Sequence, residues 1–165
     1  MTEALSRRLQ QTRFSSPQQE ATLSVAVAAS TLNDLFGEIC AKHGLTTAQY
    51  NVLRILRGAH PKGHARCEIA RRMIERAPDV TRLVDRLQAR GLVRRSRGGE
   101  DQRQAVTCIT AKGLKLLQAI QPELEASTTA RLHRLSESDC HELSHLCALI
   151  FEGEPSGGCD KPDLD

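Results

Sequence analysis

The sequence predicts a mainly helical fold with one small β element, and three observations support this prediction. Apolar residues recur at intervals of three and four along most of the chain, which is the spacing of one buried helix face. Only 2% of the residues are aromatic and Trp is absent, so the core must consist of Leu, Val, Ile and Ala, which suits packed helices better than a large sheet. Strand-type residues concentrate in one place, residues 92–109, around a pair of glycines.

The N-terminal part predicts one long helix after a flexible start. Residues 1–15 are polar, and we expect them to be flexible. Ser16 suits the N-cap, Pro17 suits the first helical position, and Gln19 could close a capping box. The helix should run to about His43, and its apolar residues are spread widely enough for two contact faces: Leu23, Val27, Leu32, Leu35, Phe36 and Ile39.

Two shorter helices follow. Thr46 and Gln49 form a second capping-box pattern, which begins a helix that should end at Gly58. Another short helix is expected over residues 66–74, and its apolar contacts are predicted to be Ile69, Ala70 and Met73.

The next predicted helix, Pro78 to Arg90, combines an apolar stripe with a basic one. Pro78 suits the first turn, and Asp79 complements the positive end of the helix dipole. The apolar stripe follows the i, i+3, i+4, i+7 pattern and consists of Val80, Leu83, Val84 and Leu87. Arginines recur at i, i+4 and i+8 on another side, at Arg82, Arg86 and Arg90. In isolation such a stripe would indicate only a solvated basic face.

A basic hairpin directly after this helix changes that interpretation. Gly91 ends the helix, residues 92–95 lead toward the turn at Gly98-Gly99, and residues 105–109 lead out. The hairpin carries four arginines, namely Arg94, Arg95, Arg97 and Arg103. A short helix, a turn, a basic helix and a basic hairpin in this order indicate a winged helix-turn-helix. The basic helix would enter a DNA major groove, and the hairpin would reach the backbone or the minor groove.

Two helices are predicted to complete the fold. Thr110 is the expected N-cap of a long helix that extends to about Leu135, and Pro122 should kink or briefly interrupt it. Ser136 is expected to cap a last helix over residues 137–151.

Three motifs together resemble the MarR (multiple antibiotic resistance regulator) family of bacterial transcription factors. They are Val80–Arg95, Asp101-Gln102-Arg103 in the hairpin, and Ile109–Gly113 at the start of the next helix. The resemblance implies an obligate homodimer on a pseudo-palindromic DNA site, with Arg103 at the wing tip and Asp101 orienting it. It divides the chain into a flexible N-terminus (1–15), a first dimerisation helix (16–44), the winged helix-turn-helix DNA-binding domain (45–110), C-terminal dimerisation helices (111–152) and a disordered acidic tail (153–165).

The distribution of charge agrees with DNA as a partner. Residues 66–120 carry 13 Lys and Arg against 6 Asp and Glu, whereas residues 121–165 carry 3 against 10. The basic excess therefore coincides with the predicted DNA-reading segment. The N-terminus lacks the apolar core of a secretory signal, and no run approaches the ~20 apolar residues of a membrane span. We accordingly expect a cytoplasmic protein without a membrane partner, with reduced cysteines and no cofactor.

A regulator of this kind also needs a signal that releases it from DNA, and a redox or metal signal is possible. Cys67 would lie in the first turn of the short helix, near Arg66 and Arg71, where the helix dipole and neighbouring cations favour a thiolate. The alternative is that the cysteines are small buried hydrophobes. His141 and His145 stand at i, i+4 and could hold a metal, although two imidazoles need further ligands and the row is otherwise a solvated face.

A small aromatic or phenolic ligand is the third possible signal. By resemblance it would bind between the dimerisation helices and the DNA-binding domain, near Phe36, Cys40, His43, Tyr50, Arg54 and Arg57. Arg54 or Arg57 could pair with a carboxylate, and otherwise these arginines merely cover a helix surface.

The sequence thus predicts a homodimeric DNA-binding regulator, most simply a repressor that a small ligand releases. The predicted DNA contacts are Thr81, Arg82, Arg86, Arg94, Arg95, Arg97, Asp101 and Arg103. The alternatives are a thiol-redox-sensing or metal-sensing regulator of the same fold, and a protein-interaction antirepressor without DNA binding. An enzyme is not expected, because the sequence shows no Ser/His/Asp set, phosphate-binding glycine loop or paired-carboxylate motif.

Overall fold

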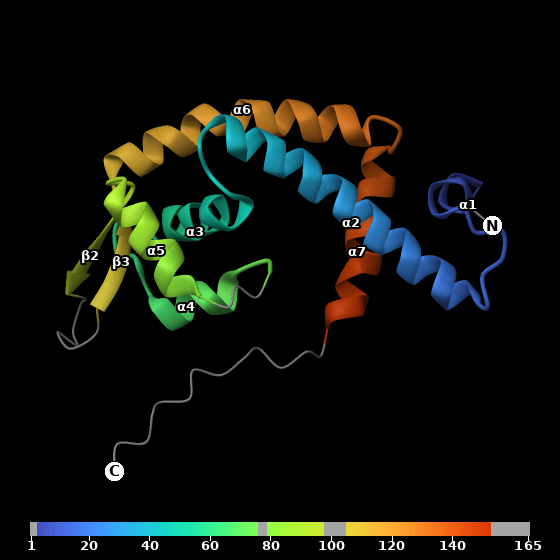
Figure 1. Ribbon diagram of the computed structural model, residues 1–165, viewed down its shortest axis with the longest axis horizontal. Helices are drawn as coiled ribbons and strands as arrows, with labels where there is room; N and C mark the ends of the chain where they lie inside the picture. Colours follow the sequence, from blue (N-terminus) through green and yellow to red (C-terminus); the bar gives the residue numbers. More distant parts are fainter. Residues whose placement is uncertain (1–2, 76–78, 98–104, 153–165) are drawn as a thin grey trace, which may run out of the picture.

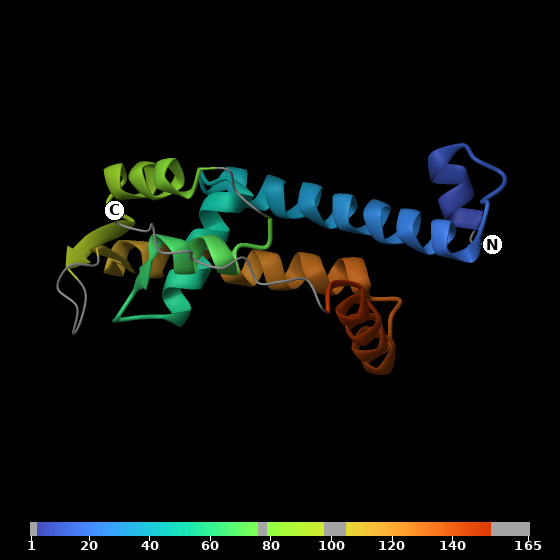
Figure 2. The same cartoon turned by 90° about the horizontal axis from the view of Figure 1, so that it is seen from below.

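The computed structural model describes residues 3–75, 79–97 and 105–152, and the mainly helical prediction is confirmed there. The elements in chain order are α1 (Glu3–Leu9), α2 (Pro17–Lys42), α3 (Thr47–Gly58), β1 (His64–Ala65), α4 (Arg66–Arg72), α5 (Val80–Ala89), β2 (Val93–Arg97), β3 (Ala105–Ile109), α6 (Ala111–Leu132) and α7 (Glu137–Phe151). The helices α3, α4 and α5 and the strands form a lobe at one end of an elongated molecule (Figure 1). The long helices α2 and α6 extend from this lobe toward α1 and α7 (Figure 2).

Local signals in the sequence set most helix boundaries. Thr46 and Gln49 form the predicted reciprocal capping box of α3. At α2 only half of the predicted box forms: Ser16 accepts from the Gln19 N–H at 3.2 Å, but the Gln19 side chain accepts from the Ser15 N–H at 2.6 Å. The helix keeps its N-cap, and the glutamine satisfies a donor one residue earlier.

The structure confirms the predicted apolar and basic faces of α5, but the helix begins later than predicted. Asp79 is the N-cap, since its side chain accepts from the Arg82 N–H at 2.9 Å, so the helix begins at Val80. Pro78 lies outside the described residues. At the other end Gly91 has φ +70°, and the Leu92 N–H donates to the Leu87 carbonyl at 3.0 Å, which closes the helix and aims the chain into the sheet.

One hydrophobic core holds α5 against α3, α4 and α6. Val80, Val84 and Leu87 of the predicted stripe are buried, and Leu83 packs partly buried against them. Fully buried large side chains around them come from α3, α4, α6 and a residue between α5 and β2, and include Leu53, Leu56, Ile69, Leu92, Leu117 and Ile120. Ala70 was predicted to join this core but is exposed, because a seven-residue helix buries only a narrow face.

The wing is a three-stranded antiparallel sheet in the order β1-β3-β2. β2 pairs with β3 from Val93 opposite Ile109 to Arg97 opposite Ala105, as the hairpin pattern predicts. The predicted turn at Gly98-Gly99 lies outside the described residues. The strand β1 was missed, because two residues are too short to show an alternating pattern.

Three further expectations changed. Residues 1–15, expected to be flexible, contain α1, whose Leu5 is only 5% exposed. Pro122 does not interrupt α6, which is continuous; Pro122 and Gln118 are both exposed, so water can bond the carbonyl that the proline leaves free. This helix ends at Leu132, three residues before the predicted Leu135.

The helix α2 corrects the expectation that no segment approaches a membrane span. By length and composition it could cross a membrane, since an 18-residue window has mean hydropathy 1.2. Only 11% of that window is buried within the chain. The side chains of α2 therefore leave an extensive apolar surface without intramolecular cover.

Candidate DNA-binding surface and ligand cavity

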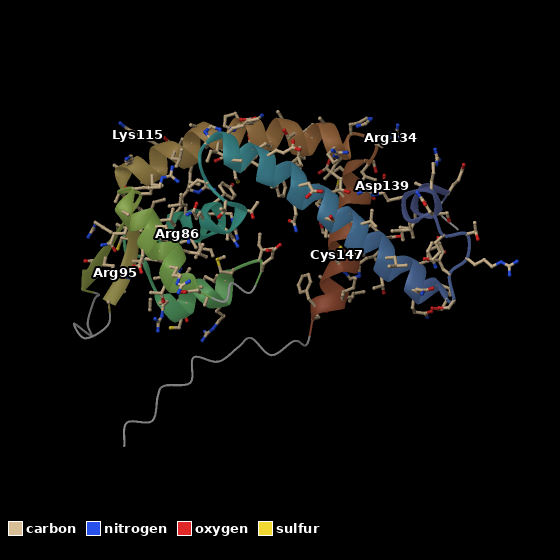
Figure 3. The ribbon with its side chains drawn as sticks, in the orientation of Figure 1. Arg86, Arg95, Lys115, Arg134, Asp139 and Cys147 are labelled. Carbon is tan, nitrogen blue, oxygen red and sulfur yellow. The ribbon has the colours of Figure 1, made fainter. Side chains whose placement is uncertain are left out.

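The exposed face of α5 carries two of the predicted DNA-contacting arginines. Arg82 Nε lies 2.9 Å from Asp79 Oδ2, and the side chain remains 79% exposed. Arg86 is exposed and has no hydrogen bond or ion pair with any residue that the structure describes. Figure 3 shows Arg86 on α5 and Arg95 on β2 at the same end of the molecule. The buried stripe thus fixes α5 so that its arginines face outward.

The strand β2 adds cations beside α5. Arg94 and Arg95 are both exposed, and Arg95 Nη2 lies 2.5 Å from Asp85 Oδ1, which ties the wing to α5. Arg97 is the last residue of β2. Asp101 and Arg103, the residues predicted at the wing tip, lie outside the described residues.

A contact between α4 and α5 was not predicted from the sequence. Thr81 is half-buried, and its Oγ1 accepts a hydrogen bond from Arg66 Nη1 at 3.0 Å. Fifteen residues separate the two in the chain, so no local pattern indicates the contact. An arginine at the start of α4 therefore belongs to the same surface as the predicted DNA contacts.

The remaining charges of α4 are mostly paired. Arg71 Nη1 lies 3.1 Å from Glu68 Oε1, and Arg72 bonds the other carboxylate oxygen. The hydrogen bond from Arg72 holds the pKa of Glu68 below its ordinary value, so this carboxylate stays charged. Burial, followed by the positive charge of Arg72, lowers the pKa of His64, which favours its neutral form.

A cavity of about 610 Å³ lies between the long helices α2 and α6 and the lobe that contains α3 and α4. Four of the six predicted ligand residues line it: Phe36, Tyr50, Arg54 and Arg57. The rest of the lining comes from α2, α3, α6 and the segment after α4, namely Asn33, Thr47, Ala48, Asn51, Met73, Ile74, Glu75, Gln121, Leu124, Glu125, Thr128 and Thr129. None of these twelve residues was predicted from the sequence to line the cavity, because their contributions to it depend on how distant helices cross.

The polar groups of this cavity are held by hydrogen bonds. Asn51 is only 5% exposed, and its Oδ1 accepts from Arg54 Nε at 3.2 Å and Nη2 at 2.9 Å. This fixes the guanidinium and leaves its other N–H groups available to an anion. Arg57 Nη1 donates to Gln121 Oε1 at 2.9 Å instead. Arg54 is therefore better suited than Arg57 to bind a carboxylate.

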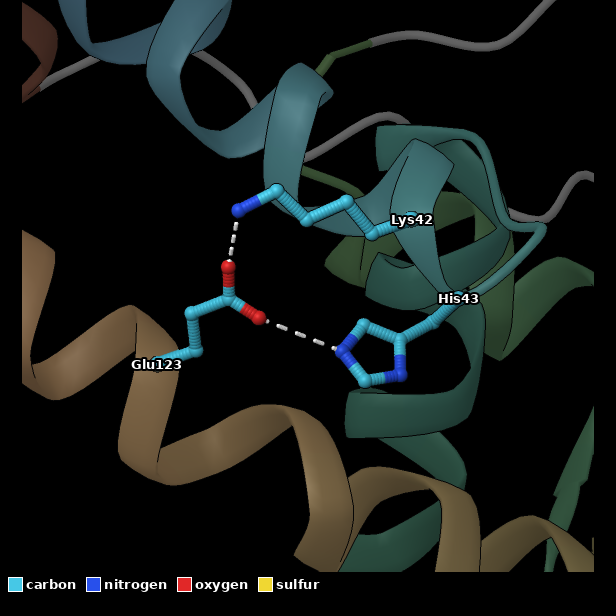
Figure 4. Close-up of polar contacts among 3 residues, drawn as sticks. All are labelled: Lys42, His43 and Glu123. Atoms are coloured by element: carbon cyan, nitrogen blue, oxygen red, sulfur yellow. Dashed lines mark hydrogen bonds and ion pairs between the residues drawn. The ribbon is translucent and has the colours of Figure 1, made fainter.

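Cys40 and His43 do not line the cavity, contrary to expectation. Cys40 is completely buried in the core, and burial raises the pKa of its thiol. His43 Nε2 lies 3.4 Å from Glu123 Oε2, and Lys42 Nζ bonds the other oxygen of the same carboxylate (Figure 4). These contacts join the end of α2 to α6, and the hydrogen bond from Lys42 lowers the pKa of Glu123.

The candidate sensor residues lie elsewhere. Cys67 is exposed in the first turn of α4, whereas Cys108 is buried and its Sγ donates to the Lys62 carbonyl at 3.5 Å. His141 Nε2 lies 3.8 Å from Glu137 Oε1 along α7. Within the described residues no group of three or more His, Cys, Asp or Glu side chains could hold a metal ion.

The comparisons with known proteins agree with this geometry. The model of the MarR family matches residues 45–105. A MarR transcription factor from Planctomyces limnophilus is 39% identical, covers 83% of this chain and 99% of its own, and superimposes with a TM-score of 0.62. The solved structure of NadR in complex with 4-hydroxyphenylacetate is 25% identical over 87% of this chain and all of its own, with a TM-score of 0.69.

One curated relative is an operon repressor. The homoprotocatechuate degradative operon repressor of Escherichia coli is 26% identical over 125 residues, which are 76% of this chain and 83% of that protein. Proteins of this kind regulate transcription and are not enzymes. The fold of the lobe and the long flanking helices thus has counterparts in solved regulators, and the chain belongs to the MarR family of transcriptional regulators.

Proposed function

We propose that this regulator is a homodimeric, sequence-specific DNA-binding repressor that a small aromatic acid releases from its operator. The observation that carries the proposal is the arrangement of α5 and β2, which present exposed arginines on one surface over a rigid core. A helix with a buried apolar stripe and a basic outer face is suited to the DNA major groove. The adjacent strand then brings further cations toward the phosphates.

The proposed DNA contacts divide by role. Thr81, Arg82 and Arg86 on α5 would face base edges and nearby phosphates. Arg94 and Arg95 on β2 would bind the backbone, and Arg97, Asp101 and Arg103 remain proposed wing contacts on the resemblance to the family.

Dimerisation would cover the apolar surface that α7 and α2 expose. Five apolar side chains of α7 are between 45% and 68% exposed, namely Leu143, Leu146, Leu149, Ile150 and Phe151. In α2, Val25 is 39% exposed. A patch of this kind on a soluble regulator favours a second copy of the chain as its partner, and a two-fold dimer would match a pseudo-palindromic operator.

The cavity is the proposed ligand site. Its apolar lining includes Phe36, Met73 and Leu124, and Arg54 supplies a fixed cation among them. An aromatic ring with a carboxylate fits this combination, as 4-hydroxyphenylacetate has in the NadR complex. Ile74 and Glu75 of the lining lie a few residues before α5 in the chain, so a bound ligand can shift the DNA-reading helix.

The test is fluorescence anisotropy with a duplex that the purified protein selects from a randomised pool. We expect tight, sequence-selective binding with a steep negative salt slope, and release by 4-hydroxyphenylacetate or a related aromatic acid. Arg54→Met should keep DNA binding but raise the ligand concentration needed for release at least about tenfold, because an ionic contact is lost. Arg57→Met is the matched control and should change release less. Failure to select any duplex would reject the DNA-binding function.

The same assay tests the alternative functions. Oxidant acting through Cys67, or a metal acting through His141 and His145, would release DNA in place of the aromatic acid. An antirepressor would bind selected and scrambled DNA equally weakly. With DNA as its partner, the protein would act in the bacterial cytoplasm.

A further inference from the structure

Arg66 at the start of α4 contacts a different kind of side chain from the other arginines of its helix. Arg71 and Arg72 both pair with the Glu68 carboxylate. Arg66 instead donates to the neutral hydroxyl of Thr81 and has no carboxylate partner among the described residues. No carboxylate of the described residues therefore offsets the charge of the exposed Arg66 guanidinium beside α5.

The direction of this hydrogen bond constrains Thr81. A guanidinium can only donate, so Thr81 Oγ1 must be the acceptor. A threonine hydroxyl carries one proton, and that proton then points away from Arg66. No acceptor for it is found among the described residues. Thr81 thus offers a donor, oriented by Arg66, at the beginning of α5.

The charge pattern on α5 and β2 makes Arg66 more important for phosphate binding. Arg82 is paired with Asp79, and Arg95 is paired with Asp85. Arg86 and Arg94, like Arg66, have no carboxylate partner within the part of the chain that the structure describes. These three arginines come from α4, α5 and β2, so each of the three elements carries a cation without a carboxylate partner among the described residues.

We propose that Arg66 is a further DNA-contacting residue, which bonds a phosphate and also positions the Thr81 hydroxyl to donate to a base-edge acceptor. One N–H of the guanidinium holds Thr81, and the remaining N–H groups are available to phosphate oxygens. Arg66 therefore adds affinity for any DNA, whereas its effect on Thr81 adds selectivity. This inference rests on the proposed DNA-binding function.

The experiment measures salt-dependent anisotropy on the duplex selected by the wild-type protein and on a scrambled duplex. Arg66→Gln should weaken binding to the scrambled duplex through its lost phosphate contact and weaken binding to the selected duplex further, because the Thr81 hydroxyl is no longer oriented. On both duplexes it should flatten the salt slope by about 1 for each protomer. Arg66→Lys keeps the charge and should restore the slope. Arg71→Gln removes the same charge from the same helix, but from an arginine that shares the Glu68 carboxylate with Arg72, and should change the slope by about half as much or less.

A double-mutant cycle tests the positioning of Thr81. Thr81→Val should weaken binding to the selected duplex by about 5- to 30-fold and leave binding to the scrambled duplex unchanged. In the Arg66→Gln background the same substitution should cost less than about threefold, because the hydroxyl is no longer oriented. Helix content and unfolding temperature measured on every variant separate a loss of contact from a loss of fold.

A wild-type salt slope in Arg66→Gln would overturn the phosphate contact. An equal cost of Thr81→Val in both backgrounds would overturn the positioning role. Both results presuppose a wild-type protein that selects a duplex, so they are distinguishable from failure of the DNA-binding function itself.

Discussion

At the scale of single residues, Glu123 illustrates how one carboxylate joins distant parts of the chain. It lies on α6 and bonds Lys42 and His43 at the end of α2, about eighty residues away. The hydrogen bond from Lys42, followed by that from His43, lowers the pKa of Glu123 below its ordinary 4.5. Such a group stabilises the fold while it is ionised.

The sign of this effect gives a pH prediction. Because the folded-state pKa is the lower one, the stabilisation from Glu123 is fully present above pH 4.5 and is lost as the pH falls through the folded-state pKa. Glu123→Gln should therefore lower the unfolding temperature at pH 7, and its difference from the wild type should vanish in acid. Thermal unfolding from pH 3 to 8 measures this. Glu142→Gln, at an exposed position on α7, is the control, and a pH-independent deficit in Glu123→Gln would contradict the assignment.

The spacing of the arginines in the sequence predicted which of them would be exposed, but it did not predict which residues they would contact. The i, i+4 spacing placed Arg82 and Arg86 on the outer face of α5, as the structure confirms. The contacts of Arg66 with Thr81 and of Arg95 with Asp85 cross between elements, so they depend on how the helices and the wing pack. Cys40 and His43 were misplaced for the same reason, since their neighbours come from other helices.

At the scale of elements, the start of α6 depends on one glycine. Thr110 caps this helix: its Oγ1 accepts from the Gly113 N–H at 3.1 Å and donates to the Gly91 carbonyl at 2.8 Å. Gly113 is buried, and a Cβ there would lie 2.4 Å from the Leu92 carbonyl oxygen and 2.7 Å from Ile109 Cγ1. The glycine thus permits α6 to pack directly against the end of α5 and the sheet.

We therefore expect Gly113→Ala to destabilise the protein by about 1–3 kcal/mol, since backbone atoms must shift to admit the methyl group. Gly58→Ala is the matched control: nothing lies within 4 Å of its Cβ position at the exposed end of α3, so better helix propensity should leave stability equal or raise it by up to about 1 kcal/mol. Urea unfolding of both variants measures the difference. If Gly113→Ala is as stable as Gly58→Ala, α6 does not need this close approach.

At the scale of the whole molecule, buried and exposed apolar groups are distributed unequally between the lobe and α7. The lobe of α3, α4, α5 and the sheet contains most of the core, whereas none of the residues of α7 is buried. Helices that expose leucines to this extent need a partner to cover them. This asymmetry is the physical basis for proposing that the lobe binds DNA and that the long helices bind a second copy.

The dimer prediction concerns Leu146, which is 49% exposed on α7. Leu146→Glu should raise the dimer dissociation constant by about 30-fold or more, because burying a leucine contributes about 2 kcal/mol and a carboxylate cannot be buried unpaired. His145→Glu introduces the same side chain at the neighbouring exposed position and should have a much smaller effect. Sedimentation velocity over a dilution series measures both, and an unchanged monomer–dimer equilibrium in Leu146→Glu would remove α7 from the interface.

The sequence by itself determined what depends on neighbours in the chain. Capping residues, the period of the apolar stripe and the glycine at position 91 set the helices and the wing, because hydrogen bonds and side-chain faces at those positions are local. Only the tertiary structure decided the strand β1, the ligand cavity and the link from Arg66 to Thr81. These features arise where segments far apart in the chain approach each other, and their distances depend on the packing of the whole core.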